Sequence, residues 1–466
     1  MRIQKFIIPV VLCAIAFSGL AQENILEQYI DEALESNITL KQKTFSYEKS
    51  LEALKEAKRM FLPTLSLEAK YTRAQGGRTV VIPFGEMMNP AYDNLDIINQ
   101  SMGATNPGYP NTPTYPDIED YTLNFIREKE QETRLQLQMP VFNSAIIHNH
   151  QIKKELADVE KINVDIYKRE LVKEVKTAYI NYLRTQQVVE VYSNSLEVTK
   201  ENLRNTSSLF ENDKVTIDEV YAAKAKVKEM EKELSNAQNE QTMAGAYLNF
   251  LMNRDLNAEI EIQRPDEIII SPYPLESLKN QALQSREELK QLDKNMEINL
   301  QKIKMEKGDA LPEVSLGATY GYQGEKYSFT ADDDFAQAGV FLSWDIFTSG
   351  QRKAKISQAK IDMKIAIEKK LKSEKQVQLE VMNTYYNLQT SLEGIGLAKE
   401  ELENYKKTFQ LVNKKYQNGM ANHLELANAL NNEVNAENKL ILARYDYYIS
   451  QIVLERITSA YQFETK

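Results

Sequence analysis

The sequence has very few residues that could form a disulfide bond or bind a metal. Of its 466 residues, one is cysteine and three are histidine. The cysteine, Cys13, lies in an apolar run near the amino terminus. His148 and His150 are two residues apart, a spacing that does not bring side chains together on a helix. We therefore expect no disulfide framework, no thiolate site and no metal cofactor.

Long apolar runs are also missing, with one exception. Residues 6–17 are apolar and follow Arg2 and Lys5, a pattern typical of a secretory signal, which we place at 1–21 with cleavage after Ala21. No small residues precede Cys13, so we expect no lipid anchor. After the signal, no stretch reaches the roughly 18 apolar residues of a membrane-spanning helix. If the mature chain crosses a membrane, it must do so with β-strands.

Basic residues are outnumbered by acidic ones. The formal net charge is −10 and becomes −12 when Arg2 and Lys5 leave with the signal. This balance argues against a nucleic-acid partner and against a basic surface for anionic lipid. The sequence also has no phosphate-binding glycine loop, nucleophile elbow or paired metal carboxylates. We predict that the protein is not an enzyme and uses no cofactor.

Proline is absent from two long stretches, 141–264 and 313–466. Their length permits long helices, because proline breaks a helix interior. In the first stretch, apolar residues such as Ile152, Leu156 and Val159 recur at helical spacing among charged ones. This pattern predicts a helix over 144–212, about 100 Å long at about 1.5 Å per residue. A returning helix over 216–253 would complete an antiparallel coiled-coil hairpin.

The same order of segments occurs twice. Residues 33–36 and 62–67 are matched 249 residues later, and residues 210–212 are matched 206 residues later, so one half carries a 43-residue insertion. We predict two tandem helix, β-hairpin, helix repeats. The domains are a signal peptide (1–21), a first repeat (22–255; hairpin about 64–142 with a long loop over 75–130, helical hairpin 143–255), a linker (256–274) and a second repeat (275–466; hairpin about 313–347, helical hairpin 348–460).

Four segments alternate apolar and polar residues, as strands with two different faces do. They are Leu65–Tyr71, Thr133–Met139, Val314–Tyr322 and Ala338–Ile346. Such strands suit a barrel between lipid and an aqueous lumen, although a soluble, half-buried hairpin has the same pattern. Four strands cannot close a barrel, so insertion requires oligomers, and three chains would supply twelve strands. Aromatic residues near the strand ends would form a membrane girdle: Tyr71, Phe142, Tyr320, Tyr322, Trp344 and Phe347.

Several short motifs accompany this order of segments. Leu62-Pro63 and Leu311-Pro312 open the strand pairs, 346–350 (Ile-Phe-Thr-Ser-Gly) closes the second pair, and 416–419 (Tyr-Gln-Asn-Gly) leads to 424–426 (Leu-Glu-Leu). Over essentially the whole mature chain, the arrangement resembles the TolC-like outer-membrane efflux protein family. The resemblance implies a mainly α fold with transmembrane β-strands. It also implies a homotrimer whose twelve-stranded barrel in outer-membrane lipid continues as an α-helical periplasmic tunnel.

The resemblance also implies a role and partners. The chain would be the outer-membrane channel of a tripartite efflux or type I secretion system, a passive gated duct that meets a periplasmic adaptor protein and an inner-membrane transporter. By position, Glu425 and its counterpart Glu219 would line the gate. The family's second acidic residue is Asn428 here, and an expected arginine is Ala421, so the bonds of a closed gate would differ. A solvated carboxylate on a helix face is the alternative for Glu425.

The turns of the two helical hairpins would contact the adaptor. They contain Asp213, Lys214, Val215, Gly419, Met420 and Ala421. Gly419 can adopt a positive φ there, and Asp213 can substitute for glycine at the matching position. A periplasmic or surface coiled-coil scaffold is the competing interpretation, because it requires the same helices and only ordinary hairpins. The exported cargo, whether drug, metal ion or protein, is left open.

Overall fold

The computed structural model describes residues 25–108, 114–263 and 274–463. The predicted signal peptide and Cys13, and most of the predicted linker, lie outside these residues. By its contacts the chain divides into two units. The helical unit contains the segments up to Leu54, Gln151–Ile303 and Ser357 onward, and the strand unit contains Lys55–His150 and Lys304–Ile356. Within the described ranges, no helix combines the length and apolar character that a membrane span requires.

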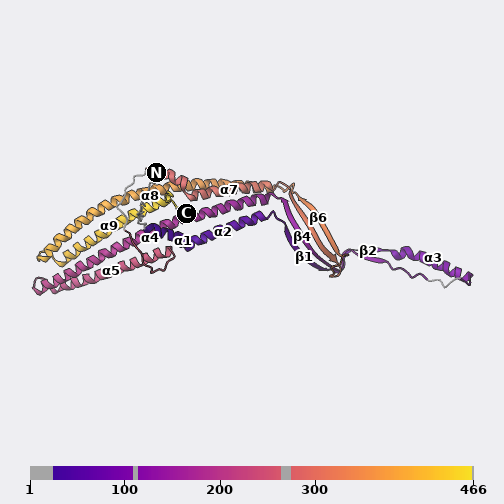
Figure 1. Cartoon of the computed structure of the whole chain (residues 1–466), viewed down its shortest axis with the longest axis horizontal. Helices are drawn as coiled ribbons and strands as arrows, with labels where there is room; N and C mark the ends of the chain where they lie inside the picture. Colours follow the sequence, from indigo (N-terminus) through magenta and orange to yellow (C-terminus); the bar gives the residue numbers. More distant parts are fainter. Residues whose placement is uncertain (1–24, 109–113, 264–273, 464–466) are drawn as a thin grey trace, which may run out of the picture. The chain divides into compact units, whose positions relative to one another are not determined.

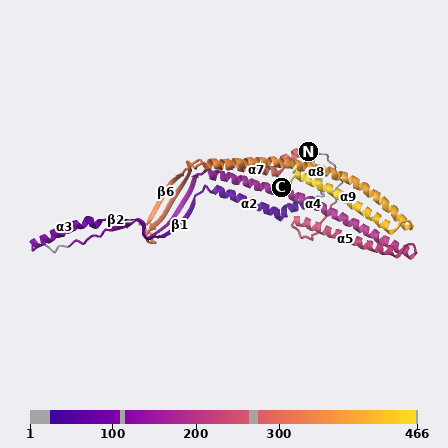
Figure 2. The ribbon, with the colours of Figure 1, turned by 180° about the vertical axis from the view of Figure 1, so that it is seen from behind.

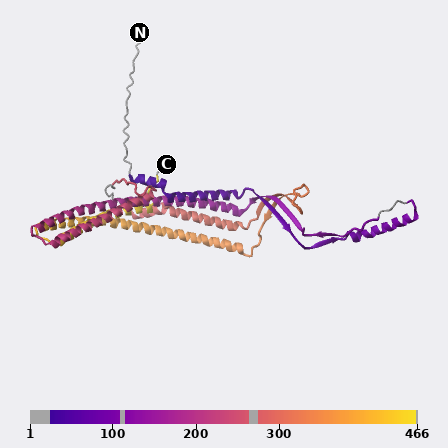
Figure 3. The same cartoon turned by 90° about the horizontal axis from the view of Figure 1, so that it is seen from below.

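Two long helical hairpins make up most of the helical unit. The helices are α4 (Ser144–Glu211) with α5 (Ile217–Leu251), and α8 (Gln351–Gln417) with α9 (His423–Ile457). The bounds of α4 and α5 lie within two residues of the predicted 144–212 and 216–253. The helices of both hairpins lie side by side in every view (Figures 1, 2 and 3). Corresponding ends of α5 and α9 are 206 residues apart in the sequence.

The helix predicted before each strand pair is broken into two. They are α1 (Ile25–Ser36) and α2 (Ile38–Arg59), and α6 (Leu275–Ser285) and α7 (Glu287–Gly308). The first break falls at the buried Asn37, whose Oδ1 accepts a hydrogen bond from Leu40 N at 2.9 Å. Its Nδ2 donates to Leu251 O, also at 2.9 Å. Asn37 thus caps α2 and ties the break to the end of α5.

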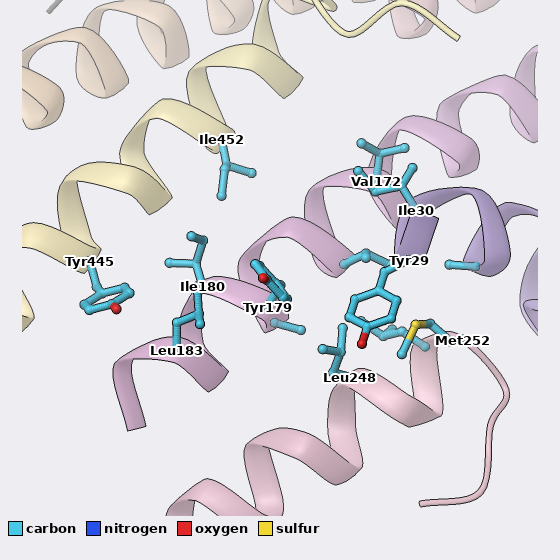
Figure 4. Packing of buried hydrophobic residues seen from close by; sticks show 14 of the residues in the cluster. Tyr29, Ile30, Val172, Tyr179, Ile180, Leu183, Leu248, Met252, Tyr445 and Ile452 are labelled. Carbon is cyan, nitrogen blue, oxygen red and sulfur yellow. The ribbon is translucent and has the colours of Figure 1, made fainter. Parts of the chain in front are cut away.

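Figure 4 shows the core of the helical unit, where side chains of α1, α4, α5 and α9 meet. Tyr29 and Ile30 of α1 pack with Tyr179 of α4 and Leu248 of α5, and all four are buried. The Tyr29 and Tyr179 rings meet edge to face at 6.0 Å. Tyr179 Oη also exchanges hydrogen bonds with the backbone of Gln263. Because α9 contributes Tyr445 to the same cluster, one core joins both hairpins.

The strand unit contains an antiparallel sheet with the order β1-β4-β5-β6 (Figure 2). Its strands are β1 (Thr64–Arg73), β4 (Lys129–Phe142), β5 (Glu313–Gly324) and β6 (Asp334–Ser343). The last strand was predicted over Ala338–Ile346, which is wrong by three to four residues at each end. The pairing explains the shift, since β6 follows β5 from Tyr322↔Asp334 to Glu313↔Ser343.

The stretch 75–130, predicted to be a long loop without a helix, contains regular structure. A two-stranded ribbon of β2 (Thr79–Ile82) and β3 (Tyr121–Asn124) leads to helix α3 (Phe84–Thr105) (Figure 1). The prediction was wrong because it treated every proline in this stretch as a helix breaker. Pro83 instead stands before the first turn, where its missing N–H costs nothing. Pro90 lies within the helix, where it removes the hydrogen bond to the Glu86 carbonyl but does not end the helix.

Candidate functional site

One face of the four-stranded sheet is apolar across all its strands. The register aligns Leu65 with Leu137, Ala318 and Ala338 in one row. The next row contains Leu67, Leu135, Tyr320 and Ala336. These side chains are not covered by the chain itself: Leu65 is 68% exposed and Leu67 69%. A continuous apolar surface of this kind on a sheet requires a covering of lipid or protein.

The opposite face of the sheet is polar. The register aligns Ser66, Gln136, Thr319 and Gln337. In the neighbouring row, the Arg134 guanidinium donates to Glu68 Oε2 at 2.7 Å and forms a second ion pair with Glu132 at 2.8 Å. Gly317 and Gly339 flank Phe341 on this face, and a Cβ on Gly317 would lie 2.7 Å from its ring. The two faces therefore have the polarity expected at a boundary between lipid and water.

The aromatic residues predicted to form a girdle fall into two groups. Tyr320 and Tyr322 contact each other edge to face at 5.8 Å, and Tyr322 contacts Phe329 at 5.2 Å, beside the β5–β6 turn. Tyr71, near the end of β1, pairs with Gln131 of β4. Phe142 is the last residue of β4, and Trp344 and Phe347 follow the end of β6. Trp344 Nε1 donates to Ala310 O at 3.1 Å. Their role as a girdle stays a prediction.

The turns of both helical hairpins have the same backbone conformation. Asp213 has φ +58° and Gly419 has φ +72°. In each turn, the next amide bonds back to the preceding helix, from Lys214 N to Leu209 O at 2.9 Å and from Met420 N to Lys415 O at 2.8 Å. These are Schellman motifs, in which a left-handed residue ends a helix. The positive φ predicted for Gly419, with Asp213 in the matching place, is confirmed.

A buried cluster joins the two turns. Tyr416 of α8 is almost completely buried, and its Oη lies 2.7 Å from Thr206 Oγ1 of α4. The Tyr416 ring also contacts the His423 ring at 6.3 Å. Sequence reasoning used Tyr416 only as part of a turn motif and missed this packing. The signal available was a large aromatic residue just before a turn, where solvent-exposed polar residues are the rule.

The two predicted gate carboxylates have different surroundings. Glu219 is half-buried in the first turn of α5, and its Oε2 is buried without a hydrogen-bond partner among the described residues. Glu425 is exposed in the first turn of α9, where its N donates to Asn422 Oδ1 at 2.9 Å, and Asn428 is also exposed. Glu219 lines an open groove of about 500 Å³ together with Asp218, Ala222, Ala225, Lys226, Glu229, Asn422, His423, Leu424 and Ala427.

His423 lies in this groove among charged and aromatic neighbours. Burial lowers the pKa of the His423 imidazole, Glu219 opposes this shift and Lys226 adds to it. Lys226 is itself buried and donates to Glu229 Oε1 at 2.8 Å. In the described part of the chain, no group of three or more His, Cys, Asp or Glu side chains could hold a metal ion. Around His423 the groove thus presents carboxylates from Glu219 and Glu229 and the ammonium of Lys226.

The chain thus combines a four-stranded sheet that has one apolar and one polar face with two long antiparallel helical hairpins. The family model described as outer membrane efflux protein matches residues 278–460. This part of the chain is therefore similar to outer membrane efflux proteins.

Individual relatives extend the similarity to almost the whole chain. The outer membrane protein TolC of Escherichia coli (strain K12) is 22% identical, and the match covers 96% of this chain and 85% of TolC. The fold is similar to that of the CmeC outer membrane channel of Campylobacter jejuni, with a TM-score of 0.71, 15% identity and coverage of 93% and 85%. The outer membrane protein VceC of Vibrio cholerae has a TM-score of 0.69 and 16% identity, and the match covers 93% of this chain and 95% of VceC.

Proposed function

We propose that this chain is one protomer of a homotrimeric outer-membrane channel that serves as a passive, gated exit duct in an efflux system. The sheet carries this proposal, because its apolar face runs unbroken across four strands and is covered by nothing in the described part of the chain. Outer-membrane lipid is the covering that fits this face, and a water-filled lumen fits the polar face with Glu68 and Arg134. The helices would then extend into the periplasm.

Closure of the sheet supplies the argument for three copies. β1 and β6 are edge strands, each with one neighbour in the sheet. Unpaired strand edges are not tolerated in hydrocarbon, so β6 of one copy must pair with β1 of the next. Such a head-to-tail contact closes into a ring, and three copies give twelve strands, enough for an aqueous bore. Exposed apolar residues along α8, including Ile361, Leu379 and Leu397, would be covered in the same assembly.

The turns of the helical hairpins are the proposed contact for a periplasmic adaptor protein. Met420 is 70% exposed and Leu424 67%, and Asp213 and Lys214 are exposed in the other turn. Exposed apolar side chains are unfavourably hydrated, and a protein contact that buries them is therefore stabilising. Energy for transport would come from an inner-membrane transporter, and this chain would catalyse no reaction. Glu219, Glu425 and Asn428 are the proposed gate residues, since they follow the two turns at the same end of α5 and α9.

The native mass of the protein extracted with detergent from the outer-membrane fraction tests this proposal. A mass of three chains that depends on detergent is expected. A soluble monomer or dimer would overturn it, and the coiled-coil scaffold would then be the better interpretation. The matched variant Leu67→Glu places a charge on the apolar face, and Ser66→Glu places one on the polar face of the same strand. Only the first should prevent membrane insertion, because a charge in hydrocarbon is costly.

A further inference from the structure

Helix α3 has an exposed apolar stripe with coiled-coil spacing. Six residues follow one another at intervals of four, three, four, three and four: Phe84, Met88, Ala91, Leu95, Ile98 and Met102. All six are exposed in the single chain. This alternation keeps side chains in one line at a period of 3.5 residues, which is the seam of a helical bundle. A helix that merely packs on its own domain would turn such a stripe inward.

A flank of α3 beside the stripe contacts its own chain, through polar groups and one pair of tyrosine rings. Asn89 accepts from Ile118 N at 2.8 Å through Oδ1 and donates to Ile118 O at 3.0 Å through Nδ2. Gly85 N donates to Asp120 Oδ1 at 2.9 Å, and Tyr92 stacks on Tyr115 at 5.1 Å. A Cβ on Gly85 would lie 2.5 Å from Ile118 O, so only glycine permits this approach. These contacts fix the helix with its apolar stripe outward.

The charges of α3 lie away from the stripe. The helix has three acidic residues, Glu86, Asp93 and Asp96, and no basic residue. With the stripe as the a and d positions of a heptad, Glu86 and Asp93 occupy the outermost positions, f. Asp96 occupies position b. The e and g positions beside the stripe are uncharged, so identical helices can approach without repulsion. Three carboxylates without a base disfavour anionic lipid headgroups as the covering instead.

We infer that the stripes of three copies pack together around the threefold axis of the channel as a parallel three-helix bundle. This inference rests on the proposed trimer, whose symmetry makes the three helices parallel. Leu95 at an a position and Ile98 at a d position favour three or four strands over two. The stripe is shorter than three heptads and too short to associate alone. A closed barrel holds the helices at high effective concentration and removes that obstacle.

The bundle would lie over the external mouth of the channel. The chain enters β1 directly after α2 and enters α4 directly after β4, so the insertion between β1 and β4 joins the strand ends that are not connected to the long helices. With the helices in the periplasm, those strand ends face the exterior. Figure 3 shows the β2–β3 ribbon continuing from the sheet into α3. Three ribbons would thus carry three helices above the exit.

Cysteine cross-linking tests the bundle, because the chain after the predicted signal contains no cysteine of its own. Leu95→Cys places a thiol in the stripe, and Asp93→Cys places one at an outer position of the same helix. Each purified variant is first weighed in detergent and then treated with a short bis-maleimide. For Leu95→Cys we expect up to about two thirds of the chains in a two-chain band, since one linker joins two of three thiols around an axis. Asp93→Cys should remain as single chains.

Added charges provide the second half of the test. Ala91→Asp introduces a carboxylate into the stripe, and Gln100→Asp introduces one at an outer f position. In the Leu95→Cys background, the first should reduce cross-linking at least about fivefold, which corresponds to about 1 kcal/mol, and the second should not. A three-chain mass with equal cross-linking of the Asp93→Cys and Leu95→Cys variants would overturn the bundle and leave the channel standing. A mass other than three chains would overturn both.

Discussion

At the scale of single residues, the buried Tyr416 links the two helical hairpins. Thr206 Oγ1 already donates to Asn202 O at 2.8 Å, so the Tyr416 hydroxyl is the donor in its bond to Thr206. Tyr416→Phe should destabilise this end of the hairpins by about 1 kcal/mol, because one buried hydrogen bond is lost without a cavity. Hydrogen exchange of the 206–216 and 416–423 amides would measure this loss of stability. Tyr221→Phe, at a 63% exposed ring on α5, is the control and should change nothing.

His423 is expected to make the same region sensitive to acid. Burial holds the pKa of His423 below its ordinary value of about 6.5, with Glu219 opposing the shift and Lys226 adding to it. A depressed folded-state pKa means that the neutral imidazole stabilises the fold above the unfolded pKa. This stabilisation is lost as the pH falls through the folded pKa.

We therefore predict weaker protection of the α8–α9 turn amides at about pH 5 than at about pH 7.5, on either side of the ordinary histidine value. Protection factors from hydrogen exchange remove the intrinsic pH dependence of exchange. His423→Phe keeps the ring contact with Tyr416 and loses the titration, so its protection should be independent of pH over this range. An equal acid response in both proteins would assign the effect to other groups.

At the scale of elements, ion pairs connect helices that are far apart in the sequence. Arg456 of α9 donates to Glu288 of α7 at 2.8 Å and to Glu170 of α4 at 3.2 Å. Burial would raise the pKa of the Glu288 carboxyl, but Arg456 and Arg286 hold it below its usual value. The ionised pair therefore contributes stability above the unfolded pKa of Glu288, and this contribution is lost in acid.

Glu288→Gln should destabilise the packing of α7 against α9 by about 2 kcal/mol at neutral pH. This value lies below the range for fully buried pairs, because the Glu288 side chain is 29% exposed. Limited proteolysis or hydrogen exchange of α7 would report the change. Glu403→Gln removes the exposed Glu403–Lys407 pair within α8 and should have no measurable effect. Equal protection of α7 in both variants would show that the pair is not needed for packing.

The elements also show which parts of the fold could be predicted from the sequence. The long helices were predictable because two proline-free stretches carry unbroken helical periodicity, and the turns because Gly419 and Asp213 suit a positive φ. The helix break at Asn37 could not be predicted, since it depends on a hydrogen bond to Leu251, 214 residues away. Helix α3 was missed although its 3.5-residue apolar spacing is visible in the sequence, because prolines were given more weight than periodicity. The partial burial of Glu219 depends on the packing of α5 against α9, which no local pattern reveals.

At the scale of the whole molecule, the position of two carboxylates after the two turns makes a prediction for the assembled channel. Three copies of Glu219 and Glu425 would place six carboxylates around a narrow bore, where they attract cations and exclude anions. The double variant Glu219→Ala, Glu425→Ala should therefore raise ion conductance in a planar bilayer and reduce cation selectivity. The exposed Glu425 can act on ions directly, whereas the half-buried Glu219 acts only if its groove opens to the bore.

The single variants separate these two contributions. Glu425→Ala alone should account for most of the loss of selectivity, and Glu219→Ala should change conductance more than selectivity, because it also removes a charge beside His423 and Tyr416. Glu403→Ala provides a control at an exposed carboxylate of α8, outside both turns. Selectivity that is unchanged in the double variant, in a channel of three-chain mass, would mean that these carboxylates do not line the bore and that the constriction lies elsewhere along the helices.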